Sequence, residues 1–145
     1  MSASSYPPVE NLIPHEPPMV WLDALEDWAP GRARCTARVD AASPFVDHEG
    51  LPAVVLLEHM AQAVAVCLGY GALLSGESVR VGMVIACRVF DLYRSSVALG
   101  TVLDVAAHRE REVDEVSNYA CEVHAGEELV ARARLTLYHA SEPPS

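Results

Sequence analysis

The chain has 145 residues, of which 51% are hydrophobic, and its formal net charge is −10 at pH 7. This length and composition suit one domain with its own core, and we expect that domain to span residues 12–140 between flexible tails at residues 1–11 and 141–145. The negative charge repels phosphate backbones and anionic lipid surfaces, so neither nucleic acid nor a membrane is an expected partner. All ten basic residues are arginines, which excludes Schiff-base chemistry and a P-loop lysine.

The four cysteines are far apart in the sequence and form no Cys-x-x-Cys pair, which excludes a zinc knuckle and a dithiol redox motif. Each lies in an apolar run, so we expect buried free thiols at Cys35, Cys67, Cys87 and Cys121. Free thiols are typical of a reducing cytoplasm. The start of the chain is polar and lacks the pattern of a signal peptide, so we expect a cytoplasmic location.

The first elements are marked by prolines and by alternation. Residues 12–25 carry Pro14, Pro17 and Pro18, and they are expected to run extended before a short strand or turn around residues 19–22. Residues 31–39 alternate small apolar side chains with mostly arginine side chains, which predicts a half-buried strand. Residues 40–50 are rich in turn formers and predict a loop.

Residues 53–74 predict one long helix. They consist largely of helix formers, and Pro52 stands where a helix prefers its first proline. The stretch is apolar on nearly all sides, so the rest of the domain has to enclose it. Glu58, His59 and Gln62 interrupt it, and because such groups are costly in a bilayer, we expect a buried helix and not a membrane span.

The remainder of the chain predicts antiparallel strands at residues 79–93, 101–108, 116–125 and 129–139. A turn at residues 125–127 joins the last two, and the charged run 109–115 is expected to be a solvated loop. One helix followed by such strands is an α+β arrangement. A single sheet covers only one side of the helix, so we expect the chain to work as a dimer.

The polar residues of the helix are the candidates for chemistry. Glu58 and Gln62 are four positions apart and share a helix face. His48 lies in the loop that leads into the helix. A carboxyl group and an imidazole beside a helix N-terminus predict an acid–base pair next to a site for negative charge.

Two motifs resemble bacterial 3-hydroxyacyl-acyl-carrier-protein dehydratases. Residues 12–19, Leu-Ile-Pro-His-Glu-Pro-Pro-Met, resemble the opening segment of that family, and residues 56–62, Leu-Leu-Glu-His-Met-Ala-Gln, resemble its central-helix motif. The resemblance covers about residues 12–139 and is closest to the subgroup of aryl polyene pigment pathways. It implies the hotdog fold, in which a curled antiparallel sheet wraps around one long central helix.

The resemblance also implies a mechanism without a cofactor. His48 would take the C2 proton of a 3-hydroxyacyl thioester, and Glu58 would protonate the departing hydroxyl. The backbone amides of Ala53 and Val54 would bind the thioester carbonyl, and Gln62 would orient Glu58. The product would be a 2-enoyl thioester, made in fatty acid or aryl polyene type biosynthesis.

The resemblance implies two partners, an acyl carrier protein and a second hotdog subunit, identical or not. The loop between His48 and the helix is shorter than in the family, and Ala53 replaces a glycine. The shorter loop favours an alternative in which the chain is a non-catalytic, acyl-binding subunit of a heterodimer. A hotdog thioesterase is a third possibility. His59 is a possible substitute base, and His15 is expected to be structural.

Overall fold

The computed structural model describes residues 5–15, 19–43, 45–76 and 82–139. Its main feature is a six-stranded antiparallel sheet with the order β1-β2-β6-β7-β8-β4. The strands are β1 (Ala24–Ala29), β2 (Arg32–Arg38), β4 (Gly82–Leu92), β6 (Val102–Val113), β7 (Val116–Ala125) and β8 (Glu128–His139). A separate small sheet pairs β3 (Leu51–Pro52) with β5 (Ser96–Val97).

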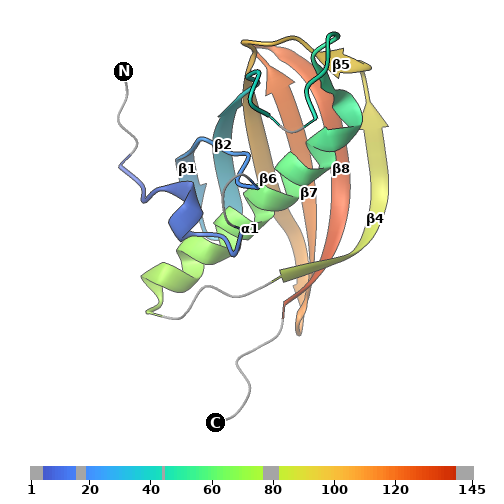
Figure 1. Cartoon of the computed structure of the whole chain (residues 1–145). Coiled ribbons are helices and arrows are strands. Elements are labelled where there is room, and N and C mark those ends of the chain that lie inside the picture. The colour runs from blue at the N-terminus through green and yellow to red at the C-terminus, as the bar shows by residue number, and fades with distance from the viewer. Residues whose placement is uncertain (1–4, 16–18, 44, 77–81, 140–145) are drawn as a thin grey trace.

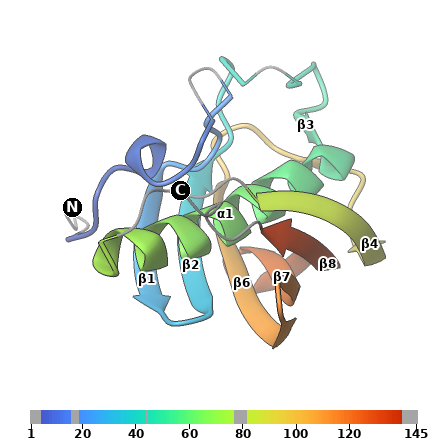
Figure 2. The same cartoon turned by 90° about the horizontal axis from the view of Figure 1, so that it is seen from below.

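The long helix α1 (Leu56–Leu74) lies in the hollow of this curved sheet and follows a single turn of 3-10 helix, η2 (Ala53–Val55) (Figures 1 and 2). Its inward residues, among them Met60, Val64 and Val66, are fully buried. By length and composition residues 53–74 could cross a membrane, but here they form the core helix of the domain. The predicted hotdog architecture is therefore confirmed.

Most predicted strands are present with the expected faces. In β2 the apolar side chains Ala33, Cys35 and Ala37 are buried, whereas the arginines of the other face are exposed: Arg32, Arg34 and Arg38. Ala33, Cys35 and Ala37 lie opposite Ala107, Val105 and Leu103 of β6, all fully buried, so alternation in both strands builds the same core layer. Gly126, with φ of 62°, makes the tight turn between β7 and β8.

One strand was missed, and two predictions about local structure are wrong. β1 was not expected, because its sequence Ala-Leu-Glu-Asp-Trp-Ala has little strand propensity; pairing with β2 imposes the strand. The charged run 109–115 is not a loop: β6 continues to Val113 and pairs with β7 beyond the core, where charged side chains can stay solvated. Cys87 is exposed, because β4 is an edge strand whose central residues, in this chain, are uncovered.

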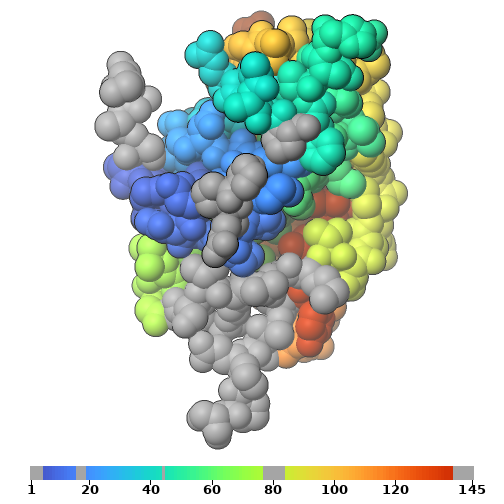
Figure 3. All heavy atoms as spheres, viewed as in Figure 1, coloured from blue at the N-terminus to red at the C-terminus, as the bar shows by residue number. Residues whose placement is uncertain are grey.

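The N-terminal segment packs on α1 and begins before the boundary predicted at Leu12. A 3-10 turn, η1 (Val9–Asn11), places Val9 and Leu12 in the core with no exposed surface. The ring of Tyr6 meets that of Tyr70 edge to face, with centroids 5.3 Å apart. In the space-filling view, the described N-terminal residues (blue) lie next to the light-green end of the helix (Figure 3). The tail predicted at residues 141–145 lies outside the described residues.

We refer to residues 12–15 and 19–21 as the N-terminal strap. Two close contacts hold it on α1. The helix lacks a side chain at Gly69, where the backbone of Leu12 passes, and the side chain of Gln62 binds the backbone on both sides of residue 20. The strap is thus fixed to the helix face that carries Glu58.

Candidate active site

One stripe of α1 carries the polar residues that the sequence motif singles out. At 100° per residue, Glu58, Gln62 and Gly69 fall within about 40° of one another around the helix axis. Gln62 is fully buried: its Oε1 accepts a hydrogen bond from the backbone N–H of Trp21 at 2.9 Å, and its Nε2 donates to the carbonyl of Met19 at 2.8 Å. Both ends of the amide are therefore occupied by the strap. The predicted role of orienting Glu58 has no hydrogen bond to support it among the described residues.

Glu58 opens onto an apolar groove of about 380 Å³. The remaining lining of the groove is apolar or aromatic: Trp21, Phe45, Val54, Val55, Leu57, Ala61, Val84 and Leu135. Glu58 is therefore the one ionisable side chain among the described residues of the lining. A carboxyl group on the wall of an apolar groove is an arrangement for proton transfer to a bound acyl chain.

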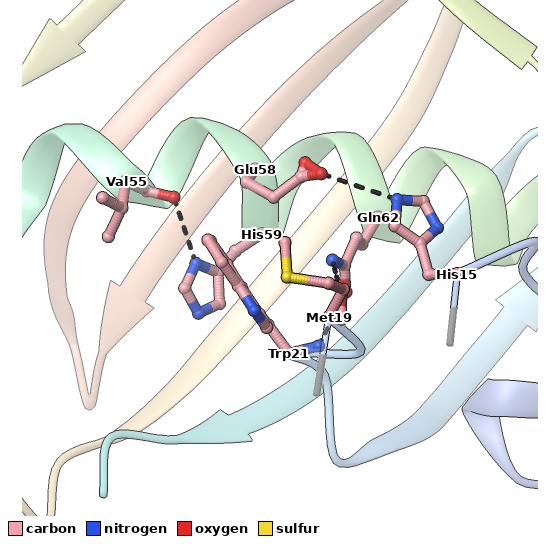
Figure 4. A network of polar contacts seen from close by, with 7 residues as sticks. All are labelled: His15, Met19, Trp21, Val55, Glu58, His59 and Gln62. Atoms are coloured by element: carbon pink, nitrogen blue, oxygen red, sulfur yellow. Dashed lines mark hydrogen bonds and ion pairs between the residues drawn. The ribbon is translucent and has the colours of Figure 1, made fainter. Parts of the chain in front are cut away.

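The nearest ionisable partner of Glu58 is His15 of the strap. Its Nε2 lies 3.5 Å from Oε1 of Glu58, and the two side chains are 28% and 35% exposed (Figure 4). This contact was not predicted, because His15 was expected to be structural and the whole of β1 and β2 lies between it and Glu58 in the sequence. No local sequence pattern signals a contact over that separation.

His48 does not meet Glu58 within this chain. It lies in a turn closed by the backbone pair Asp47 and Gly50, and its side chain is 89% exposed. Its Nε2 lies 3.9 Å from Oε1 of the neighbouring Glu49. The turn thus leaves the predicted base on the surface of the described chain, away from Glu58.

The two amides predicted to bind the thioester carbonyl differ. The N–H of Ala53 donates to the carbonyl of Ser95 at 3.0 Å, so it is already satisfied. Ala53 itself is fully buried. Val54 is exposed and lines the groove beside Glu58. Of the two, Val54 is the one placed to meet a substrate.

His59, the possible substitute base, faces a different cavity. That cavity, of about 220 Å³, is lined by Asp23, Arg38 and Asp40 among others. The ring of His59 lies against Trp21, its Nδ1 donates to the carbonyl of Val55 at 3.3 Å, and it points away from the Glu58 carboxylate (Figure 4). Burial lowers the pKa of His59 to about 4, so the ring is neutral near pH 7.

The buried cysteines are unsuited to nucleophilic chemistry. Burial raises the pKa of Cys35 and Cys121 to about 12 and that of Cys67 to about 11. Such thiols are not ionised near neutral pH, and the thiolate is the reactive form. A cavity of about 460 Å³ that includes Cys67 lies at the other end of α1 and does not contain Glu58. The Glu58 groove is therefore the better candidate.

Comparison with known proteins shows the family of this chain. A family model described as "ApeP-like: ApeP dehydratase" matches residues 7–145, almost the entire sequence. The chain belongs to the ApeP-like dehydratase family. It is therefore a hydro-lyase, as the two sequence motifs indicate. Membership of this family confirms the resemblance that those motifs carry.

Individual relatives agree with this assignment. The 3-hydroxyacyl-[acyl-carrier-protein] dehydratase FabZ of Natranaerobius thermophilus is 30% identical, over 88% of this chain and 92% of that protein. A chain of the dehydratase heterocomplex ApeI:P from Xenorhabdus doucetiae superimposes with a TM-score of 0.88 at 26% identity, covering 94% of this chain and 93% of that one. The PaaI protein of the E. coli phenylacetic acid degradation operon has a TM-score of 0.64 at 19% identity, over 79% and 80% of the two chains, and shows the fold alone.

Proposed function

We propose that this chain removes water from 3-hydroxyacyl thioesters presented by an acyl carrier protein, with Glu58 as the acid. The observation that carries the proposal is the position of Glu58, the one ionisable group in the described lining of an apolar groove. The groove suits an acyl chain, and Val54 at the start of the helix is placed beside the reacting end. Family membership and the FabZ relative support this substrate class.

The reaction balances with one acid and one base. The base removes a proton from C2, and the electrons of that C–H bond form the C2–C3 double bond. The C3–O bond breaks as Glu58 gives its proton to the leaving oxygen, and water departs. The proton taken by the base and the one lost by Glu58 are then exchanged with solvent, so the reaction needs no redox partner.

We propose that the base is an imidazole of a second hotdog subunit. His48 of this chain is on the surface, and His15, although 3.5 Å from Glu58, is not among the residues that line the groove. A base that reaches C2 of a substrate in the groove therefore has to come from another molecule. The side of β4 that does not pair with β8 has no partner strand among the described residues, and exposed Val84 and Ile85 lie on this strand. Val84 also lines the groove, so a subunit docked along β4 would close the site.

The partner and location follow from the same proposal. A chain of the ApeI:P heterocomplex superimposes on this chain with a TM-score of 0.88, which supports a different subunit as the partner. An identical subunit is the competing arrangement. We propose a cytoplasmic location, which an acyl carrier protein substrate and a role in the biosynthesis of fatty acids or aryl polyenes would support.

Turnover of a 3-hydroxyacyl-carrier protein, followed by mass spectrometry as loss of water, tests the proposal. The purified chain would be assayed alone and with the second hotdog subunit. We expect turnover by the pair, and Glu58→Gln should lower it by roughly 10²–10⁴-fold, the range typical of a lost general acid. His48→Ala is the matched control and should leave turnover by the pair unchanged.

The other readings give different results in this experiment. If the chain binds acyl groups without taking part in the chemistry, the pair that contains Glu58→Gln keeps full turnover. If His48 is the base in a homodimer, the chain alone is active and His48→Ala abolishes that activity. A thioesterase would release free acid instead of the enoyl thioester.

A further inference from the structure

The strap brings His15 to Glu58 by packing that is independent of either side chain. Leu12 and Ile13, which precede Pro14 and His15, are buried, and the backbone of Leu12 lies against Gly69. After residues 16–18, the side-chain amide of Gln62 is hydrogen-bonded to the backbone of Met19 and of Trp21. His15 therefore lies between two anchored points, and its location against Glu58 is imposed by the fold.

The contact is one-sided at the carboxyl group. Nε2 of His15 faces Oε1 of Glu58, and no polar partner of Oε2 is found among the residues that the structure describes. The other ring nitrogen of His15, Nδ1, is buried, and it has no hydrogen-bond partner among the described residues. Nδ1 of the imidazole thus faces the protein interior, and Nε2 faces Glu58.

The distance decides what such a pair can do. A good hydrogen bond to an oxygen has a heavy-atom distance of about 2.7–3.2 Å, and proton transfer needs a similar separation. At 3.5 Å the two groups attract one another, but they are too far apart for ready transfer of a proton. The pair is therefore suited to orienting the carboxyl group.

We propose that His15 is a positioning residue for the dehydration, which fixes Oε1 of Glu58 so that Oε2 faces the bound acyl chain. This inference rests on the role of Glu58 proposed above. Glu58 has a flexible side chain and no other polar partner among the described residues. Without His15 the carboxyl group would sample several rotamers, and a displacement of about 1 Å in a reacting group can cost a factor of roughly 10² in rate.

Substitutions of similar size test the proposal. His15→Gln keeps a donor near the position of Nε2, whereas His15→Leu keeps bulk and removes the donor. Each would be assayed with the second hotdog subunit on 3-hydroxyhexanoyl-carrier protein. We expect His15→Leu to lower kcat by roughly 10–100-fold with little change in KM, as for a misplaced catalytic group. His15→Gln should recover most of kcat, and both variants should melt within a few degrees of the parent.

A double substitution separates positioning from structural support. If His15 acts through Glu58, His15→Leu has no further effect on kcat in the Glu58→Gln background. An equal loss in both backgrounds, or unchanged kcat in His15→Leu alone, overturns the proposal. Loss of turnover with Glu58→Gln but not with His15→Leu leaves the proposed function standing and refutes only the role of His15. No turnover by the parent pair overturns both.

Discussion

A Cβ atom on Gly69 would lie only 1.8 Å from the carbonyl oxygen of Leu12. The N-terminal strap rests directly on the bare backbone of α1 at this point, and a backbone atom cannot turn aside as a flexible side chain can. We expect Gly69→Ala to lower the free energy of unfolding by about 1–3 kcal/mol, the usual range for overpacking a core. Urea denaturation of parent and variant measures the difference.

Gly71 of the same helix provides the control for this prediction. A Cβ there would meet the ring of Trp28 at 3.4 Å, an ordinary contact. Because alanine favours a helix over glycine, Gly71→Ala should raise the free energy of unfolding by as much as ~1 kcal/mol. Equal stability of the two variants would show that the strap does not rest on Gly69.

Gln62 supports a second prediction. Replacing it by methionine keeps a long unbranched side chain but removes both hydrogen bonds to the strap, so the N–H of Trp21 and the carbonyl of Met19 lose their partners. An unsatisfied group of this kind costs about 1–3 kcal/mol, and we expect a loss of about 2 kcal/mol in total for these partly buried groups. Glu58→Gln, a change at a partly exposed side chain, should alter stability by no more than about 0.5 kcal/mol.

The measurement for Gln62→Met is again urea denaturation, combined with turnover of the pair. Trp21 lines the groove, so a loosened strap should also weaken substrate binding and raise KM. A fully stable Gln62→Met variant would mean that the strap is held without this amide.

Periodicity predicted the parts of the fold whose burial follows from a regular pattern. The apolar run of residues 53–74 has no alternative to a buried helix, and alternation in residues 31–39 fixed both the strand and its buried face. β1 and the outer half of β6 lack such a pattern. Both are strands because a neighbouring strand offers a row of unpaired backbone groups, and that kind of cause is visible only in three dimensions.

Residues of the candidate site could be predicted only where they belong to a recognisable sequence motif. Glu58 was chosen from the central-helix motif, and its role as the acid stays a proposal that its position in the groove supports. The contact with His15 depends on how the strap crosses the helix. The occupied amide of Ala53 depends on the chain reaching Ser95, and both of these are tertiary relationships. His48 was chosen by its place in the sequence, and its side chain is exposed in a turn away from Glu58.

His59 makes stability depend on pH. Its pKa is lowered from 6.5 to about 4 by burial, so between these values the unfolded chain binds the proton more readily than the folded chain does. The contribution of neutral His59 to the free energy of unfolding is then fully present above pH 6.5, and it is lost as the pH decreases toward 4. At about 1.4 kcal/mol per pKa unit, the loss is on the order of 3 kcal/mol.

Asp23, which lines the same cavity as His59, acts in the opposite direction. Burial raises its pKa, so protonation below that pKa favours the folded chain. The contribution of His59 is therefore obtained by comparing the parent with His59→Phe in urea at pH 7 and pH 4.5. We expect the variant to lose less stability than the parent on acidification. The same loss in parent and variant would show that protonation of His59 does not cause the loss of stability at low pH.

The reactivity of the four cysteines should locate the subunit interface. Cys87 is exposed on the edge strand β4, whereas the remaining cysteines are buried and have raised pKa values: Cys35, Cys67 and Cys121. A thiol reagent such as DTNB should therefore modify one cysteine quickly in the isolated folded chain and all four after unfolding in urea. Cys87→Ser should abolish the fast reaction.

Pairing along β4 would cover Cys87, because a strand added to that edge lies directly over its central residues. Adding the second hotdog subunit should then slow the reaction of Cys87 in proportion to the fraction of chain bound. Self-association should slow it as the concentration of the chain rises. If Cys87 stays fully reactive in a complex whose mass by light scattering is that of a pair, the partner docks elsewhere, and the groove at Glu58 is not closed along β4.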